Sequence, residues 1–219
     1  MKNIQKIEFH CGTKEELFSS ITDSFPYMSS CAELDKFPNR CVPWHWHKEV
    51  ELIYLEEGQF LVDINMEPTW LEKGFCFINQ EELHALKAEG NVKESALVFN
   101  LEMLGFSMYD EVQARFIQPI LENKLHFPRF IGIKNMVGKE ILIHYERIVQ
   151  WHQQSGQFSI ATGGSVAEGL SAQLNIKVEL LNILMILQNN GLFLEDKSGS
   201  VDYKVESIKK VLSYIEEHY

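Results

Sequence analysis

The sequence predicts a mainly β domain with a helical region after it. Three observations favour this class. Short apolar segments follow one another closely between residues 50 and 101, and Gly, Pro or Asn separates them. Strands this short and closely spaced are typical of a barrel or sandwich rather than of a parallel α/β sheet. After residue 101 the apolar residues recur at helical spacing instead.

The predicted strands run over Val50–Leu55, Phe60–Ile64, Phe75–Ile78, His84–Ala88 and Val92–Leu101. We expect turns at Glu56–Gly58, Lys73–Gly74 and Glu89–Asn91, because Gly and Asn tolerate the backbone angles that turns need. A further strand is expected between Phe25 and Asn39. Together these segments predict a small barrel or sandwich.

The helical region is predicted to hold Asp110–Glu122, which Pro119 kinks or ends, then Val137–Gln153, Glu168–Asn189 and Lys204–Tyr219. Glu168–Asn189 is apolar over more than one side, so it must be covered on several faces. Either the barrel covers it completely, or part of it packs against the same helix of a second subunit. Periodicity alone leaves both interpretations open. The candidate dimer contacts on its apolar face are Ile176, Leu180, Leu181, Leu184 and Leu187.

The segment Trp44–Gly58, WHWHKEVELIYLEEG, carries candidate ligand side chains for a metal or a polar molecule, in the pattern H-x-H-x3-E-x6-G. On a strand, alternate side chains face the same side, so His45, His47 and Glu51 can converge. His84 is a fourth candidate if a neighbouring strand supplies it. Three imidazoles and a carboxylate suit a divalent transition metal such as Zn, Ni, Fe or Mn. The alternative is an organic ligand or a hydrogen-bond network at the barrel mouth.

Aromatic side chains near these residues suggest a pocket for a small molecule, since such pockets combine apolar walls with a few polar groups. The candidate ligand-binding residues are His45, His47, Glu51, His84, Trp46, Tyr54, Phe60, Phe77 and Asn79. Aromatic faces beside hydrogen-bond acceptors would suit a carbohydrate. Trp46 has the opposite parity to the histidines, however, and could instead point outward into the core or under the helices.

Composition narrows the function classes. The net charge of −11 argues against binding of a nucleic-acid backbone by this chain alone. The start of the sequence has no apolar core of signal-peptide length, and the apolar run Leu180–Leu187 is too short to span a bilayer. We therefore expect a cytoplasmic protein without a membrane segment. Its cysteines form no C-x-x-C pair and are expected to be free thiols.

The His/Glu pattern resembles the first and second motifs of the cupin superfamily, small β-barrels with a site inside. Four segments resemble more closely the sensor half of AraC-type transcriptional regulators. They are VPWHWHKEVELIYLEEG, LEKGFCFINQEELHAL, ALVFNLEML and FIQPILENKL with a following FP. This resemblance runs from about Phe25 to the end of the sequence. The asparagine that closes the second motif of many cupin enzymes is replaced by Ala88, which weakens the case for catalysis more than the case for the fold.

The resemblance implies a cupin-like double-stranded β-helix barrel with an N-terminal arm (residues 1–105) and a helical dimerisation region (106–190). A flexible linker and the first helix of a helix-turn-helix DNA-binding domain (191–219) would follow. The residues present cannot hold two helix-turn-helix units, so DNA would be bound through a C-terminal domain missing from this sequence. We therefore expect a homodimeric sensor of a small effector and no enzymatic activity. The competing hypothesis is a cupin metalloenzyme that uses His45, His47, Glu51 and His84.

Overall fold

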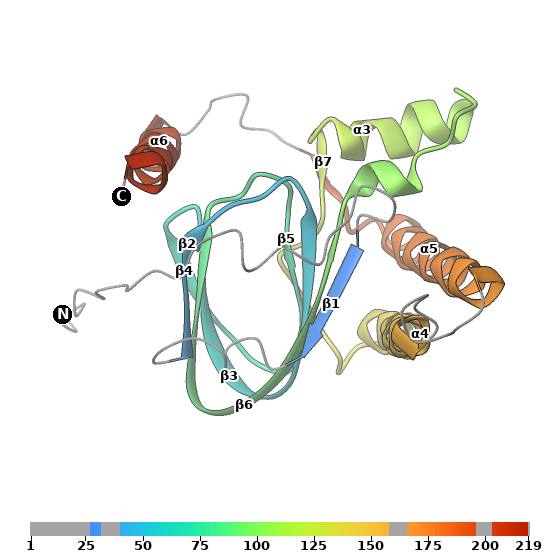
Figure 1. Ribbon diagram of the computed structural model, residues 1–219, viewed down its shortest axis with the longest axis horizontal. Helices are drawn as coiled ribbons and strands as arrows, with labels where there is room; N and C mark the ends of the chain where they lie inside the picture. The colour runs from blue at the N-terminus through green and yellow to red at the C-terminus, as the bar shows by residue number, and fades with distance from the viewer. Residues whose placement is uncertain (1–26, 32–39, 158–165, 196–202, 219) are drawn as a thin grey trace.

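The computed structural model describes residues 27–31, 40–157, 166–195 and 203–218. Its centre is a barrel-like antiparallel β structure, and helices lie along one side of it (Figure 1). Seven strands form one sheet: β1 (Tyr27–Cys31), β2 (Cys41–His45), β3 (Val50–Ile64), β4 (Glu67–Leu71), β5 (Gly74–Ile78), β6 (His84–Phe99) and β8 (Phe130–Gly132). Two short strands, β7 (Leu125–His126) and β9 (Leu194–Glu195), pair with each other outside it. The mainly β fold with added helices is therefore confirmed.

Strands β3 and β6 are each continuous, over 15 and 16 residues. The turns expected at Glu56–Gly58 and Glu89–Asn91 were wrong in this respect, because neither ends a strand. The pairing of β3 with β6 instead shifts register twice between Leu55 and Gln59. Gly58 lies in this irregular stretch with a φ of 90°, and a Cβ there would approach the Asn91 carbonyl oxygen to 2.4 Å. Such irregularities bend a strand, so β3 and β6 bend together and contribute to two facing layers.

The two layers enclose an apolar interior. In one layer residues 50–55 of β3 pair with β5 and β6, and in the other residues 60–64 pair with β4 and β6. The side chains buried between the layers are Val42, Ile53, Leu55, Phe60, Val62, Ile64, Leu71, Cys76, Ile78, Leu86, Ala88 and Ala96. Since alternate residues of a strand face opposite sides, the outer face of the first layer is left to pack against helices.

A second core fills the space between that outer face and the helices. Leu52 and Tyr54 of β3 point into it, and the ring centroid of Tyr54 lies 5.5 Å from that of Tyr145 of α4 (Met136–Gln157). The Tyr145 hydroxyl lies 2.8 Å from the Ser95 hydroxyl of β6, which gives the buried phenol a hydrogen-bond partner. Helix α5 (Val166–Asn189) packs beside α4 and completes this layer. The molecule is thus three layers thick here: sheet, sheet and helices.

The remaining helical elements connect these layers. The 3-10 helix η2 (Leu101–Leu104), the π-helix η3 (Gln113–Ile117) and the short α3 (Gln118–Leu121) follow β6. Pro119 lies in the first turn of α3, directly after the π-helical turn, and does not end the helical segment there. Helix α6 (Tyr203–His218) lies apart from α4 and α5, near the end of β2 (Figure 1). Leu194 and Glu195 are paired in β9, so the expected linker at 191–201 is partly ordered. The N-terminal arm and residues 196–201 of that linker lie outside the described residues.

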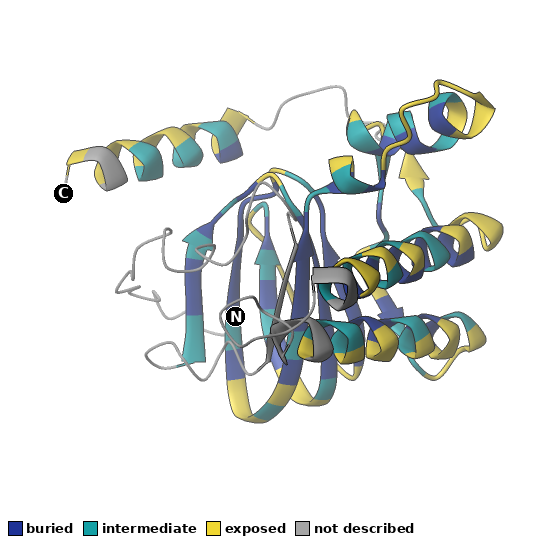
Figure 2. Ribbon diagram, turned by 45° about the vertical axis from the view of Figure 1, so that its right-hand side comes forward, coloured by how far each residue is buried: buried dark blue, intermediate teal, exposed yellow. Residues whose placement is uncertain are grey.

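Helix α5 corrects the expected dimer contacts. Ile176, Leu180, Leu184 and Leu187 are at most 2% exposed and lie in the core between the helices and the sheet, and Leu181 packs against the same core. Ile176, Leu180, Leu184 and Leu187 are covered by their own chain, so they cannot form the surface for a second copy, whereas Leu181 is only half-buried. The exposed apolar side chains of α5 are instead Leu170, Leu174, Val178 and Met185. Figure 2 shows the corresponding division of α4 and α5 into a buried inner side and an exposed outer side.

The length and mean hydropathy of 1.4 over Gly169–Asn189 would suffice for this one helix of the described chain to cross a membrane. In this fold, 39% of that stretch is buried against the molecule's own core. The packing of its inner side therefore accounts for part of the apolar content of α5.

Gly138 lets α4 approach β8 closely. A Cβ at this position would lie 2.3 Å from the Gly132 carbonyl oxygen, a backbone atom that cannot move aside. We expect Gly138→Ala to lower the free energy of unfolding by about 1–3 kcal/mol or more, as overpacking does. Urea unfolding followed by circular dichroism measures this. Gly169→Ala is the matched control, because no atom lies within 4 Å of its added Cβ; equal stabilities of the two variants would contradict the prediction.

A buried histidine and glutamate centre at the barrel mouth

The four predicted metal ligands come together from three elements and a connecting segment. His45 is the last residue of β2, Glu51 is the second residue of β3, and His84 is the first residue of β6. His47 lies in the segment between β2 and β3. The expectation of one strand presenting His45, His47 and Glu51 by alternation was wrong, since the chain leaves β2 after His45. The antiparallel register places His45 directly opposite His84, as the two-strand arrangement requires.

The geometry is compact and buried. The potential ligand atoms of His45, His47, Glu51 and His84 all lie within 4.8 Å of one another. The four residues are between 0% and 9% exposed. Ring centroids of the histidines are 4.1 to 5.8 Å apart, and the rings of His47 and His84 meet edge to face. Such a separation allows one ion to contact all four side chains.

Each histidine is fixed by a backbone carbonyl. Nδ1 of His45 lies 2.8 Å from the Pro43 oxygen, and Nδ1 of His47 lies 3.0 Å from the Glu49 oxygen. Nδ1 of His84 lies 2.8 Å from the Glu82 oxygen. A carbonyl oxygen only accepts hydrogen bonds, so each Nδ1 carries the proton that it donates. Nε2 of each ring is thereby left as the atom with the lone pair, which is the usual arrangement behind a histidine ligand.

Electrostatics favour a cation at the centre. Nε2 of His84 and of His47 lie 3.3 and 3.7 Å from Oε2 of Glu51. Burial, and then the neighbouring His84 and His47, hold the pKa of His45 well below its ordinary value. Burial alone would raise the pKa of Glu51, but the neighbouring His47 and His84, when protonated, lower it far below the usual range. An ionised carboxylate therefore faces imidazole nitrogens that can also accept. Either a proton on one of these rings or a metal ion must stand between them.

The amide of Asn79 is used for structure and does not reach this centre. Its Oδ1 accepts a hydrogen bond from the Phe127 backbone N–H at 2.7 Å, and its Nδ2 donates to the Phe127 oxygen at 3.4 Å. The Glu82 carboxylate accepts from the Asn79 backbone N–H at 2.7 Å and pairs with Arg129. The assignment of Asn79 as a ligand-binding residue is therefore corrected. Glu82 and Arg129 were missed because they lie 47 positions apart in the sequence, and only the fold brings them together.

We expect Asn79→Ala to lower the free energy of unfolding by about 1–3 kcal/mol, since it leaves buried backbone groups of Phe127 without their partners. Thermal or urea unfolding measures the loss. Asn91→Ala, at an exposed position, is the control. Equal stability of Asn79→Ala and the wild type would show that this network contributes nothing.

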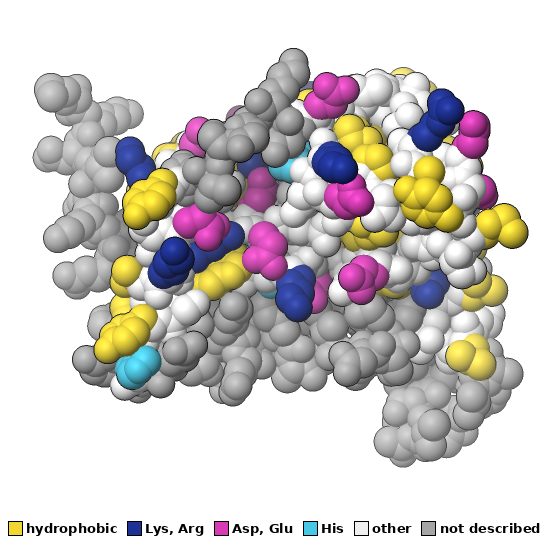
Figure 3. All heavy atoms as spheres, turned by 90° about the horizontal axis from the view of Figure 1, so that it is seen from above, with side chains coloured by type: hydrophobic (Ala, Val, Ile, Leu, Met, Phe, Trp, Pro, Cys, Tyr) yellow, Lys and Arg dark blue, Asp and Glu magenta, His cyan; other side chains and the backbone are white. Residues whose placement is uncertain are grey.

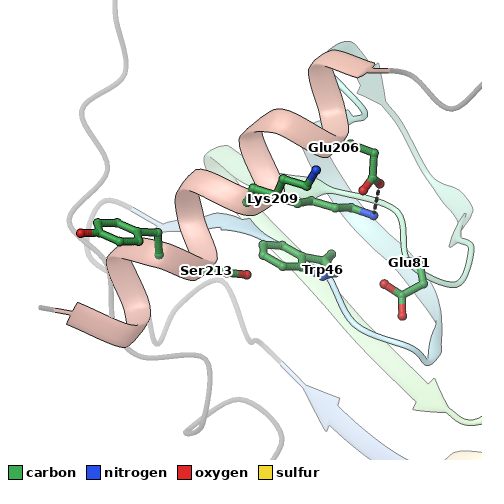
Figure 4. A pocket seen from close by; sticks show the side chains of 7 residues that line it. Trp46, Glu81, Glu206, Lys209 and Ser213 are labelled. Carbon is green, nitrogen blue, oxygen red and sulfur yellow. Dashed lines mark hydrogen bonds and ion pairs between the residues drawn. The ribbon is translucent and has the colours of Figure 1, made fainter.

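The aromatic residues expected around a ligand are divided among different places. Tyr54 stacks on Phe75 and Phe77 stacks on Phe127, all in the core under the helices. Tyr54 and Phe77 are thus corrected: they face away from the barrel interior. Phe60 does lie in the interior, at the level of Leu71 and Ala88 rather than of the histidines. Trp46 is half-buried beside the centre, on the side that faces α6 (Figure 4).

A small cavity opens into the barrel from the side of β4 and β8. Its volume is about 110 Å³, and its inner wall includes Val62, Ile64 and Cys76, with Glu67 and Arg129 at the rim. Pockets that bury drug-sized ligands are commonly about 300 Å³ or larger. This cavity would therefore admit only a very small molecule without movement of the rim.

The antiparallel barrel with its buried centre, followed by helices, has a cupin-like architecture. Residues 27–119 match the AraC-like ligand binding domain, in support of the expected resemblance to an AraC-type sensor region. It is similar to the uncharacterized HTH-type transcriptional regulator YdeC of Bacillus subtilis (strain 168), with 24% identity over 207 residues. The match covers 94% of this chain and 66% of that relative, so the chain spans just under two thirds of its length.

Among solved structures, two of oxalate decarboxylase share 27% sequence identity with a part of the chain. One of them concerns the Mn(II) centres of the Bacillus subtilis enzyme. Each match has a TM-score of 0.25 and covers 27% of this chain and 18% of the other.

Proposed function

We propose that the chain senses its signal at the histidine and glutamate centre, where His45, His47, Glu51 and His84 bind a divalent metal ion. The observation that carries this proposal is the convergence of buried acceptor atoms. Three imidazoles with their Nδ1 protons committed to carbonyls surround one ionised carboxylate. A transition metal ion satisfies all four acceptors at once, and nitrogen with carboxylate oxygen suits Zn, Ni, Fe or Mn.

The bound metal would supply a fixed positive charge at the barrel mouth. A small effector with oxygen or nitrogen donors could then bind next to it, in contact with the rim of the barrel. The stacking argument for a carbohydrate loses its support, because Tyr54 and Phe77 face the helices. An effector shifts the regulator only if it binds one arrangement of the chain better than another.

We infer a regulatory and not a catalytic role. The matched domain is a ligand-binding domain, and the similar full-length relative is a transcriptional regulator. Ala88 stands where many cupin enzymes carry an asparagine. We further propose that the protein acts in the cytoplasm, and that DNA is bound by a domain beyond the residues of this chain.

Dimerisation is proposed through the outer side of the helical layer. Leu170, Leu174, Val178 and Met185 are 45–64% exposed and follow one another at spacings of four, four and seven residues along α5. Leu181 completes the run between Val178 and Met185 and is half-buried. Residues at these spacings share one side of a helix, and we call this set the α5 stripe. An exposed apolar row of this kind fits the same row on a second copy.

Elemental analysis of protein purified without a histidine tag tests the metal proposal. We expect about one equivalent of a single divalent metal per chain, and its loss in a variant with both His45→Ala and His47→Ala. His126→Ala, outside the centre, should keep the metal. The wild type is also incubated with Zn²⁺, Mn²⁺, Fe²⁺ or Ni²⁺ and desalted. If it still holds no metal, the metal proposal fails and the histidines have a structural role as hydrogen-bonding groups.

A further inference from the structure

Helix α6 rests on the outer side of the segments that hold the histidines. Figure 4 shows α6 crossing above Trp46, with Glu81 on the barrel side of the same groove. The groove has a volume of about 550 Å³. Figure 3 shows acidic and basic side chains side by side on this end of the molecule, without a continuous patch of one sign. The groove therefore lies between α6 and the barrel of the same chain and is not a positively charged surface.

The contact of α6 with Trp46 is specific. Nζ of Lys209 lies 6.0 Å from the centre of the Trp46 ring, and Oε1 of Glu206 lies 3.4 Å from the same Nζ. The Lys209 side chain is only 13% exposed, although lysine is among the residues least often buried. A cation above a tryptophan ring at this distance is attracted to it. Val205, 6% exposed, adds apolar packing one turn earlier in the helix.

The barrel side of this contact is built from the neighbours of the ligands. Trp46 lies between His45 and His47 in the sequence, and successive side chains of an extended segment point to opposite sides. The Glu81 backbone N–H donates a hydrogen bond of 2.8 Å to the His47 carbonyl oxygen. The next residue, Glu82, holds Nδ1 of His84 through its own carbonyl. Any movement that brings His47 and His84 onto a common ion thus moves Trp46 and Glu81 as well.

Helix α6 is held weakly enough to respond. Among its described side chains, Val205 alone is buried, whereas α5 has buried side chains along its whole inner side. Val211, Tyr214 and Ile215 remain largely exposed. A helix attached by one small contact area can be released or tightened by a modest change beneath it.

We propose that α6 reports the occupancy of the centre: metal binding fixes Trp46 and Glu81 and so tightens the docking of α6 on the barrel. This inference rests on the metal-binding function proposed above. By linkage, the docked helix must favour metal binding by the same factor as the metal favours docking. Helix α6 leads toward the expected DNA-binding half. The contact between Trp46 and Lys209 would therefore transmit metal occupancy of the barrel directly to that half, in addition to any effect on the dimer.

Hydrogen–deuterium exchange of the 219-residue chain, with and without one equivalent of Zn²⁺, tests the proposal. We expect Zn²⁺ to slow exchange in residues 203–218 at least about fivefold in the wild type. Trp46→Ala and Lys209→Gln should abolish this slowing. Lys209→Gln touches no ligand, so it should still bind Zn²⁺, as measured by calorimetry. Trp70→Ala, at an exposed position on β4, should behave as the wild type.

Three results would contradict the inference, and they differ from one another. If Zn²⁺ binds the wild type but α6 exchanges at the same rate with and without it, the coupling is absent while the metal site stands. If calorimetry shows no binding of Zn²⁺ to the wild type, the proposed metal function itself fails and the coupling fails with it. Preserved slowing in Lys209→Gln would also contradict the assigned route.

Discussion

Metal-stripped protein is expected to unfold at a markedly lower temperature than the same protein with saturating Zn²⁺. The ligand atoms of His45, His47, Glu51 and His84 converge only in the folded chain, so metal binding favours the folded state by mass action. A free metal concentration about a thousandfold above the Kd would add about 4 kcal/mol to the free energy of unfolding. Differential scanning calorimetry with chelator and with Zn²⁺ measures the shift in Tm.

His84→Ala should remove this shift, and His126→Ala should keep it. The comparison is made between each variant with and without metal, because His84→Ala also loses the hydrogen bond to the Glu82 carbonyl. A wild-type Tm that is the same with chelator and with Zn²⁺ would contradict a metal site at this centre. An equal shift in His84→Ala would place the bound metal elsewhere.

A variant with both Leu174→Glu and Val178→Glu is expected to be monomeric and folded. These side chains are 64% and 45% exposed and belong to the α5 stripe. In the monomer the introduced carboxylates are therefore solvated and do not disturb the fold. In a symmetric dimer each substitution occurs twice, and both copies place carboxylates in an apolar contact. Sedimentation velocity should show a mass about half that of the wild type, with an unchanged circular dichroism spectrum.

Trp70→Glu, on the exposed face of β4, is the control and should leave the wild-type mass. By contrast, a charge at Leu184 would test folding and not assembly, because that side chain is 2% exposed inside the core. A wild-type chain that sediments as a monomer at all concentrations, or a Leu174 and Val178 variant that remains dimeric, would remove the α5 stripe as the interface of this chain.

The sequence predicted the parts of the site that depend on residue identity. His45, His47, Glu51 and His84 stood out by their spacing, and the structure brings their side chains together in one buried centre. It could not predict how they converge. The chain leaves β2 after His45, and the histidines are oriented by the carbonyls of Pro43, Glu49 and Glu82. Backbone carbonyls have no sequence signature, so only the fold shows which ones are within reach.

The sequence predicts that the two long strands break at Gly58 and at Gly90, because glycine usually marks a turn. In the structure both strands continue through this region, and the register between them shifts instead. Glycine serves a bulge and a turn for the same reason, its freedom to adopt positive φ. The local sequence therefore could not distinguish a strand that ends from a strand that bends.

By itself, the sequence determined the class of fold, the helical positions and the four side chains of the centre, because these follow from periodicity and from chemical type. Only the tertiary structure decided which apolar face meets which layer. Tyr54 and Phe77 pack under helices, and Leu180 and Leu184 pack inside the chain, while the α5 stripe stays exposed. The physical reason is that β3 and α5 are apolar on more than one side. Alternation then shows that two faces differ, but only packing shows what covers each of them.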